Sequence, residues 1–344
     1  MIKETAVNKK RIEFIDLAKG VCILLVVSGH CGGSIDLPGF QMMRMPLYFI
    51  LSGLFFKDYG GFLELSVKKI NKILIPFLFF YLIAYIPYYL FEWLKPGLIR
   101  TDAQGILDIF NNRQFFNGPI WFLLALFWAN LIFCAISLNV KKEYFRALIV
   151  VLIGFIGILL GNNDIFLPCF FDVAMSALPF FYFGYILKKT PLLFPNRFDR
   201  YNFILVVLLY LITYAITVLF NGPHFSFHYN KLYGNVILTY IGSISCVIAI
   251  LLLCKMLRHV PIISYCGRYS IILLCLHHMI YRPIKLVVDK LDINNSGDII
   301  SLLTIAICIA MIPLCIKFIP WFTAQKDLIK SPSEWIKCRK LCHD

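Results

Sequence analysis

Charged residues are scarce in this chain of 344 residues: only 15% are Asp, Glu, Lys or Arg, against about 25% in a typical soluble domain. Hydrophobic residues make up 60%, and soluble domains of this length could not bury that much apolar surface. A membrane-spanning helix needs about 20 mostly apolar residues, so the composition suffices for roughly ten spans. The chain is therefore predicted to be an all-α polytopic integral membrane protein and not a soluble enzyme.

The sequence also lacks a C-x-x-C pair, an internal repeat, a low-complexity tract and a long linker. Most of its 12 Cys fall inside apolar runs, where a thiol behaves as a small hydrophobic side chain, and their spacing favours this over a disulfide framework. The closest group, Cys338, Cys342 and His343, lies near the end of the chain, and we predict no metal site. We expect one transmembrane domain over residues 1–325 and a basic cytoplasmic tail at 326–344.

The apolar runs place the expected spans along the chain. They cover 14–31, 45–56, 70–93, 118–139, 146–161, 167–187, 202–220, 232–256, 262–281 and 298–321. The second run has only about 12 residues against the usual 20, so we expect a short or re-entrant element there.

Positive charge is distributed as expected for membrane topology. The net charge is +14, but Lys and Arg form short clusters between apolar runs, which does not indicate a nucleic-acid surface. With a cytoplasmic N-terminus, 22 of them fall in inside segments and 8, including Arg44 and Arg113, in outside segments. The positive-inside rule then predicts that both termini are cytoplasmic.

An ionisable residue at the centre of a bilayer costs about 2.5–3.5 kcal/mol to insert, so each one is a candidate functional residue. The first run contains Asp16, Lys19 and His30. Lys19 and His30 are about three helical turns, or about 16 Å, apart on one face, and Asp16 shares that face. This stripe predicts a polar passage across the membrane. An interfacial Asp16–Lys19 pair with a snorkelling His30 explains the pattern equally well.

Three further candidates lie in other apolar runs. Asp172 needs a partner from another helix, and a structural ion pair fits it as well as a chemical role. His277 is typical of a satisfied core histidine, and Trp121 is typical of an interfacial aromatic residue.

Cations near the predicted cytoplasmic ends of spans form another group. Arg268 follows Gly267 in a position where anion binding and snorkelling are equally reasonable interpretations. Lys69 and Lys72 precede Ile73-Leu74-Ile75-Pro76 and also fit a simple positive-inside flank.

Several short motifs occur in a fixed order along the chain. They are Arg11-Ile-Glu-Phe-Ile-Asp16-Leu-Ala-Lys19-Gly20, Val26-Val27-Ser28-Gly29-His30, Met45-Pro46-Leu47-Tyr48-Phe49-Ile50-Leu51-Ser52-Gly53, Lys69-x-x-Lys72, Gly118-Pro119-Ile120-Trp121, Phe183-Gly184, and Gly267-Arg268-Tyr269-Ser270 with His277 seven residues later. In this order the chain resembles the acyltransferase-3 family of integral membrane acyltransferases over about residues 11–320. It is most similar to the subgroup of fucose 4-O-acetylases and related sugar O-acetylases.

This resemblance implies an O-acyltransferase in the cytoplasmic (inner) membrane, in contact with membrane lipids. Its co-substrate would be acetyl-CoA or another acyl-CoA, with no permanently bound cofactor. Its acceptor would be a hydroxyl of a cell-envelope or exported glycan, or of a lipid-linked sugar. A homodimer is compatible with this interpretation, and nucleic acid is not an expected partner.

The resemblance also implies roles for individual residues. The Arg-x10-His pair of the family falls on Lys19 and His30, and its R-x-x-R pair falls on Lys69 and Lys72, which keeps the charge but loses bidentate geometry. Position 44 is Arg where close relatives are expected to have His. The implied catalytic residues are His30, Lys19 and Asp16; the implied acyl-CoA-binding residues are Lys69, Lys72, Arg268, Ser52 and Gly53; the implied acceptor-binding residues are Arg44, Trp121, Asp172 and His277.

Histidine suits the expected chemistry, because a hydroxyl is a poor nucleophile until a base that is neutral near pH 7 removes its proton. A secondary transporter or a lipid or glycan flippase would also place ionisable residues on one stripe. Transporters usually have paired halves with broken helices at matching positions, and this chain shows no such symmetry. A non-catalytic membrane scaffold would leave Asp16, Lys19 and His30 unexplained.

Overall fold

The computed structural model describes residues 12–34, 38–94, 107–111, 113, 115–194, 199–220, 222, 224–291 and 296–333. Arg11, where the first motif begins, and residues 334–344 of the expected tail, with Cys338, Cys342 and His343, lie outside the described residues.

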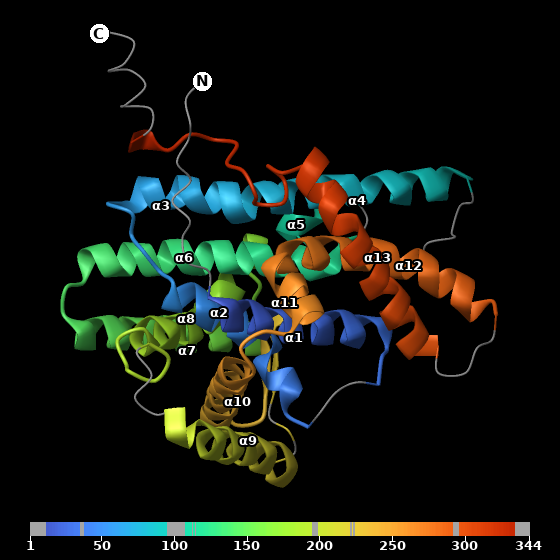
Figure 1. The fold of residues 1–344 in the computed structure, drawn as a ribbon. Coiled ribbons are helices and arrows are strands. Elements are labelled where there is room, and N and C mark those ends of the chain that lie inside the picture. Colours follow the sequence, from blue (N-terminus) through green and yellow to red (C-terminus); the bar gives the residue numbers. More distant parts are fainter. Residues whose placement is uncertain are drawn as a thin grey trace, which may run out of the picture.

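The described residues confirm an all-α architecture of long, closely packed helices (Figure 1). The helices are α1 (Glu13–Cys31), α2 (Arg44–Leu54), α3 (Phe62–Lys69), α4 (Ile75–Leu94), α5 (Asp108–Asn111), α6 (Trp121–Asn139), α7 (Glu143–Asn162), α8 (Phe171–Leu187), α9 (Asn202–Leu219), α10 (Val236–Leu257), α11 (Pro261–Arg268), α12 (Ser270–Asp289) and α13 (Ser296–Phe318).

Among the described residues, nine helical stretches are long and apolar enough to span a membrane. They are Glu13–Cys31, Phe62–Pro87, Gly118–Asn139, Glu143–Asn162, Pro168–Leu187, Asn202–Leu219, Val236–Leu257, Ser270–Asp289 and Ser296–Phe318. Each corresponds to one of the ten predicted runs, and the remaining run is the short one, 45–56. The prediction of a polytopic membrane protein is therefore confirmed.

The short run forms α2, which has 11 residues and lies antiparallel to α1. The thiol of Cys22 donates to the carbonyl oxygen of Arg44 (3.0 Å), and the hydroxyl of Tyr48 donates to the carbonyl oxygen of Lys19 (3.1 Å). Arg44 therefore lies level with the middle of α1, although the sequence assigned it to an outside segment. The chain returns beside α1 before α2 begins, which is why a helix of half the usual length is sufficient here.

The predicted run 262–281 is divided in the structure. It ends one helix, α11, at Arg268 and begins another, α12, at Ser270, with Tyr269 between them. The membrane-length helix is therefore Ser270–Asp289, and Arg268 lies outside it. Pro261 at the first position of α11 is typical of a helix start, because its missing N–H would have no partner there.

Four glycines of the motifs serve two close helix crossings. A Cβ on Gly53 would meet the carbonyl oxygen of Phe181 at 1.8 Å, and one on Gly184 would meet that of Ile50 at 1.9 Å. The crossing of α2 and α8 thus excludes any side chain at either position. Gly20 and Gly267 have the same function where α1 crosses α11. Small residues let helix backbones approach closely, which drives helix association in lipid.

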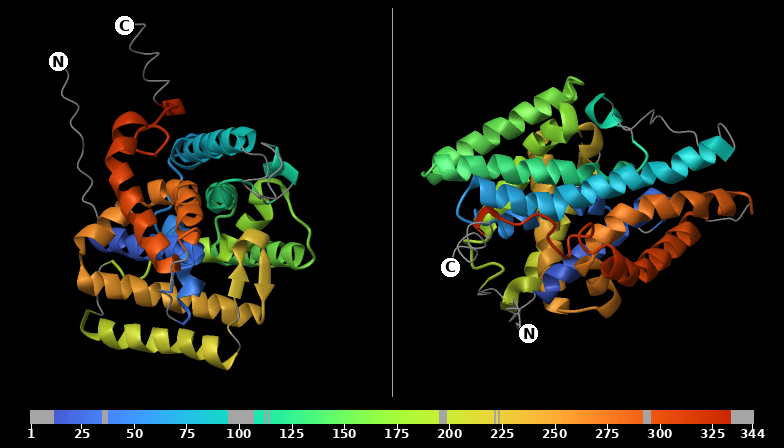
Figure 2. Two further views of the ribbon diagram at one scale, coloured as in Figure 1. Left: turned by 90° about the vertical axis from the view of Figure 1, so that its right-hand side faces the viewer. Right: turned by 90° about the horizontal axis from the view of Figure 1, so that it is seen from above.

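A small antiparallel hairpin lies between α9 and α10, and its second strand takes up the first residues of the predicted run 232–256. Strands β1 (His224–Ser226) and β2 (Lys231–Tyr233) pair on either side of a turn at Phe227–Tyr229. The strands are visible in the left view of Figure 2, where α9 is the lowest helix and packs on α10. Only 17% of the apolar window of α9 is buried, as expected for a helix that faces lipid on most sides.

Cysteines take part in the core as the sequence suggested. Ten of them lie in the described residues, all ten are free thiols, and all but Cys169 are buried.

Candidate functional site

A cavity of about 350 Å³ opens beside the C-terminal end of α1. We call it the histidine cavity. Its wall comes from α1, the turn before α2 and the start of α2, the turn before α6 and the start of α6, the hairpin and α12. The lining residues are Val26, Gly29, His30, Gln41, Arg44, Met45, Pro119, Trp121, Phe225, Ser226, Phe227, His228 and Leu274.

Three imidazole rings meet at one side of this cavity. The ring centroid of His30 lies 5.4 Å from that of His277 and 6.1 Å from that of His278, and the last two are 6.2 Å apart. Nδ1 of His277 donates to the carbonyl oxygen of Leu273 (2.9 Å), and Nδ1 of His278 donates to that of Phe116 (3.2 Å). Within the described ranges, no group of His, Cys, Asp and Glu has a geometry that could hold a metal ion.

A fourth histidine enters the cavity from the hairpin. His228 lies in the turn between β1 and β2, with its ring edge-on to Trp121 at a centroid distance of 5.8 Å. Burial, with smaller contributions from the nearby Arg113 and His30, lowers the pKa of His228 to about 4. His228 is therefore neutral near pH 7, and it can either donate or accept a hydrogen bond.

Asp172, at the start of α8, binds residues that hold the hairpin in place. Its side chain is fully buried and pairs with Nη2 of Arg113. The same carboxylate accepts from Nδ2 of Asn230 (2.9 Å) and from the backbone N–H of Leu167 (3.3 Å). Arg113 in turn donates from Nη1 to the carbonyl oxygen of His228 (2.7 Å). Asp172 thus has the structural ion pair that the sequence left open, and this pair holds His228 in place.

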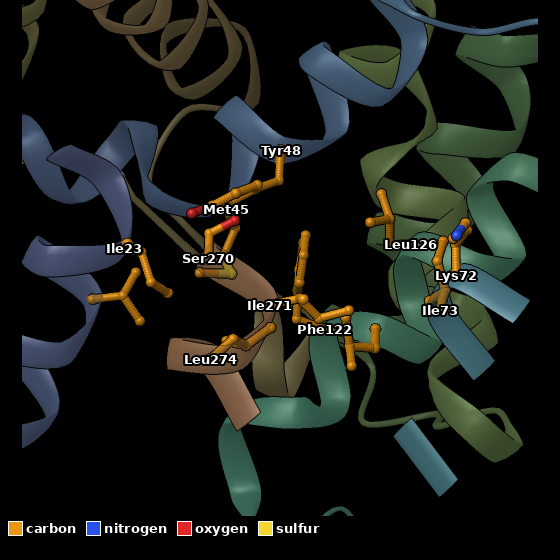
Figure 3. A pocket seen from close by; sticks show the side chains of 12 residues that line it. Ile23, Met45, Tyr48, Lys72, Ile73, Phe122, Leu126, Ser270, Ile271 and Leu274 are labelled. Carbon is orange, nitrogen blue, oxygen red and sulfur yellow. The ribbon is translucent and has the colours of Figure 1, made fainter. Parts of the chain in front are cut away.

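A second cavity, of about 150 Å³, lies between α1, α2, α6, α12 and the turn Ile70–Leu74 that precedes α4. We call it the apolar cavity. Its lining residues are Ile23, Val26, Met45, Tyr48, Lys72, Ile73, Phe122, Leu123, Leu126, Ser270, Ile271 and Leu274. In Figure 3, Lys72 lies beside Ile73 and Leu126 on one side, and Tyr48, Ser270 and Met45 lie on the other. Lys72 therefore places a positive charge at one side of a cavity whose lining is otherwise mostly apolar.

The two cavities adjoin each other. Val26, Met45 and Leu274 line both, so three apolar side chains form the wall between Lys72 and His30. Met45 is unbranched and flexible, which suits a wall that has to adapt to a ligand. An apolar wall of three side chains thus separates a cation in one cavity from the imidazoles at the other.

Residues 319–333, which we call the C-terminal strap, cross over the Lys72 side of the apolar cavity. Lys72 Nζ lies 2.7 Å from Oδ1 of Asp327 and donates to the carbonyl oxygen of Ala324 (2.9 Å). The neighbouring Asn71 is only 1% exposed, and its Oδ1 accepts from the backbone N–H groups of Leu328 and Ile329, both at 2.8 Å. A π-helical turn at Ile70–Leu74 carries Asn71 and Lys72; such turns are frequent at functional sites.

The other predicted site residues lie away from the histidine cavity. Asp16 and Lys19 form an ion pair on α1 (3.7 Å), and they lie about 21 Å and about 16 Å, respectively, along the helix from His30. Lys69 is half-buried at the end of α3, and Arg268 is exposed at the end of α11. The hydroxyl of Ser52 donates to Oδ1 of the buried Asn130 (3.2 Å), next to the α2–α8 crossing at Gly53. Their predicted roles stay predictions.

Of the predicted residues, the structure brings together His30, Arg44 and Trp121 in the cavity wall, with His277 directly behind them. Sequence reasoning missed His228, His278, Arg113 and Asn71. The unpaired Asp172 was a signal that a buried cation had to exist, but it did not identify Arg113. A lone histidine in a loop gives no comparable signal.

The fold and the cavity together define a multi-pass membrane protein with a cluster of imidazoles at a pocket that adjoins a second, apolar cavity. The family model for the acyltransferase-3 domain, described as an acyltransferase domain, matches residues 12–319. The chain therefore belongs to the acyltransferase-3 family and is a membrane acyltransferase. No curated protein and no solved structure matches the chain.

Proposed function

We propose that the protein transfers an acyl group, most simply acetyl, from acyl-CoA to a hydroxyl of a cell-envelope or exported glycan. The single observation that carries the proposal is the pair of adjoining cavities, with Lys72 on one side and His30 on the other. Family membership supplies the reaction class. The fucose 4-O-acetylase-like subgroup, in which the acceptor is a sugar, remains part of the proposal, as do the inner-membrane location and the cytoplasmic termini.

The donor binds from the side of Lys72. A CoA thioester ends in phosphates, which need cations, and Lys72 and Lys69 lie within one turn of each other. The arm between the phosphates and the thioester is thin and flexible and fits a narrow channel. The apolar cavity then carries the thioester towards Met45 and Leu274, the wall that it shares with the histidine cavity.

The acceptor binds in the histidine cavity. Its wall combines an aromatic face, Trp121, with groups that can donate or accept hydrogen bonds, including Gln41, Ser226 and His228. Sugars present alternating apolar faces and hydroxyls, so this mixture suits them. A lipid-linked sugar fits the same cavity, because the protein lies in the membrane.

His30 acts as the general base. The acceptor oxygen attacks the thioester carbonyl carbon, and the C–O bond forms while a ring nitrogen of His30 takes the hydroxyl proton. The tetrahedral intermediate then collapses, and the C–S bond breaks. The proton passes from His30 to the departing sulfur, which leaves an ester, free CoA and a neutral imidazole.

The test is acetyl-CoA turnover by the purified chain in detergent, with and without a mixture of envelope glycans. We expect acetyl transfer by the wild type and at least about a 100-fold loss in His30→Ala, since general-base catalysis contributes typically 10²–10⁴-fold. His224→Ala is the matched control, because His224 is an exposed histidine on the hairpin outside the cavity wall. Normal turnover in His30→Ala would refute the assignment of the base.

Glycan mass spectrometry of cells with and without the gene then identifies the acceptor. A transporter would instead move an unmodified glycan, so an unchanged set of acetyl esters would refute the proposed reaction.

A further inference from the structure

The tautomer of His277 is fixed by its surroundings. Nδ1 of His277 lies 2.9 Å from the carbonyl oxygen of Leu273, one turn earlier in α12. A carbonyl oxygen can only accept a hydrogen bond, so Nδ1 carries the proton. The other nitrogen, Nε2, then presents a lone pair in the neutral ring.

This lone pair has no partner in the described residues. The side chain of His277 is 0% exposed, and Nε2 is buried without a hydrogen bond. Buried polar atoms nearly always have a partner, so an orphaned acceptor needs an explanation. The ring of His30 lies against that of His277, at a centroid distance of 5.4 Å and tilted by 41°.

His30 needs such an acceptor in order to act as a base. A neutral imidazole has one N–H and one lone pair, and the lone pair must face the acceptor hydroxyl. In many enzymes a carboxylate holds the N–H of the catalytic histidine and so fixes its tautomer. The described lining of the histidine cavity contains no Asp or Glu, and Asp16 is about 21 Å away along α1.

We infer that His277 is the positioning residue for His30: its Nε2 accepts the N–H of His30, so that the other nitrogen of His30 faces the cavity. This inference rests on the proposed function and deepens it. His277 touches neither substrate, and it acts through His30 alone. When His30 takes the hydroxyl proton, its cation still donates to the same Nε2 of His277.

His278 is a weaker candidate for this role. Its ring is farther from His30, at 6.1 Å, and its side chain is partly exposed. Water can therefore satisfy the free nitrogen of His278, whereas the nitrogen of His277 is sealed from solvent.

Two substitutions separate positioning from packing. His277→Asn keeps the hydrogen bond to Leu273, because asparagines elsewhere in this chain bond the carbonyl one turn earlier: Asn130 to Leu126 (2.7 Å) and Asn139 to Ala135 (2.8 Å). It lacks an acceptor at the position of Nε2. His277→Gln reaches that position with its amide oxygen and restores the acceptor.

The experiment measures kcat and KM for acetyl-CoA in the wild type, His277→Gln and His277→Asn. We expect His277→Gln to stay within about fivefold of the wild-type kcat, and His277→Asn to lose about 100-fold with an unchanged KM. Thr239→Val, a buried polar change on α10, controls for general damage to the fold. Elution profile and melting temperature in detergent confirm that each variant is folded.

The outcomes are distinguishable. If His277→Asn is as active as His277→Gln, or if both are equally impaired in kcat while folded, the positioning role is refuted and the proposed function stands. If the wild type transfers no acetyl group, the proposed function fails and this inference fails with it. A rise in KM with unchanged kcat would make His277 a substrate-binding residue and would also refute the inference.

Discussion

Removal of the charge on Asp172 tests how the fold holds the cavity. Asp172 is 0% exposed and its partner Arg113 is 9% exposed, so Asp172→Asn leaves a guanidinium buried without its counter-charge. Breaking a buried pair from one side costs about 3–5 kcal/mol. At about 2 °C or more per kcal/mol, the melting temperature should fall by about 6 °C or more.

The hairpin provides the matched control. Lys231 on β2 pairs with Asp164 (2.7 Å), but the two side chains are 33% and 61% exposed. Asp164→Asn should therefore cost less than about 1 kcal/mol. Asn also tolerates the left-handed backbone at this position, where φ is 57°.

The assay is thermal unfolding in detergent, followed by acetyl transfer. Removal of both partners in the double variant Arg113→Met with Asp172→Leu should recover part of the stability, because no uncompensated charge remains. It should not recover activity, because Arg113 also holds the backbone of His228. Equal melting temperatures for Asp172→Asn and Asp164→Asn would refute the reasoning.

Two further predictions concern the donor side and pH. Asp327→Asn should lower the apparent KM for acetyl-CoA by up to about fivefold, because it releases Lys72 from its ion pair, whereas Lys72→Ala should raise this KM. Added salt should reduce both effects. An increased KM in Asp327→Asn would show that the strap itself binds the donor. Because the pKa of His228 falls from 6.5 to about 4 on folding, the unfolded chain binds more protons below pH 6.5, so stability should fall between pH 6.5 and about 4. The loss at pH 5 is at most about 2 kcal/mol, and melting curves of His228→Gln should depend less on pH than those of the wild type.

The sequence by itself determined that the chain lies in a membrane and where most of its helices are. Hydropathy is a local property that adds up along a segment, so a run of about 20 apolar residues identifies a span without any knowledge of its neighbours. The same reasoning correctly marked the run 45–56 as too short. It erred at 262–281, because the break at Tyr269 separates two helices that are both apolar.

Some motif glycines have a packing role that the sequence did not predict. Gly53 and Gly267 belong to motifs for which the sequence suggested donor binding, and in the structure both also permit close helix crossings. A glycine needed for close packing and one needed near a ligand look the same in a sequence, because both simply lack a side chain.

Only the tertiary structure decided which distant residues meet. His30, His228 and His277 come from three elements far apart in the chain, and the sequence singled out His30 and His277 but not their contact. Asn71 contacts Ile329, 258 positions later, and Arg113 reaches Asp172 from a loop. Such pairings depend on how the helices pack, and no local sequence pattern encodes them. A polar residue needs a protein partner only when packing buries it away from water, and its sequence neighbours do not show this.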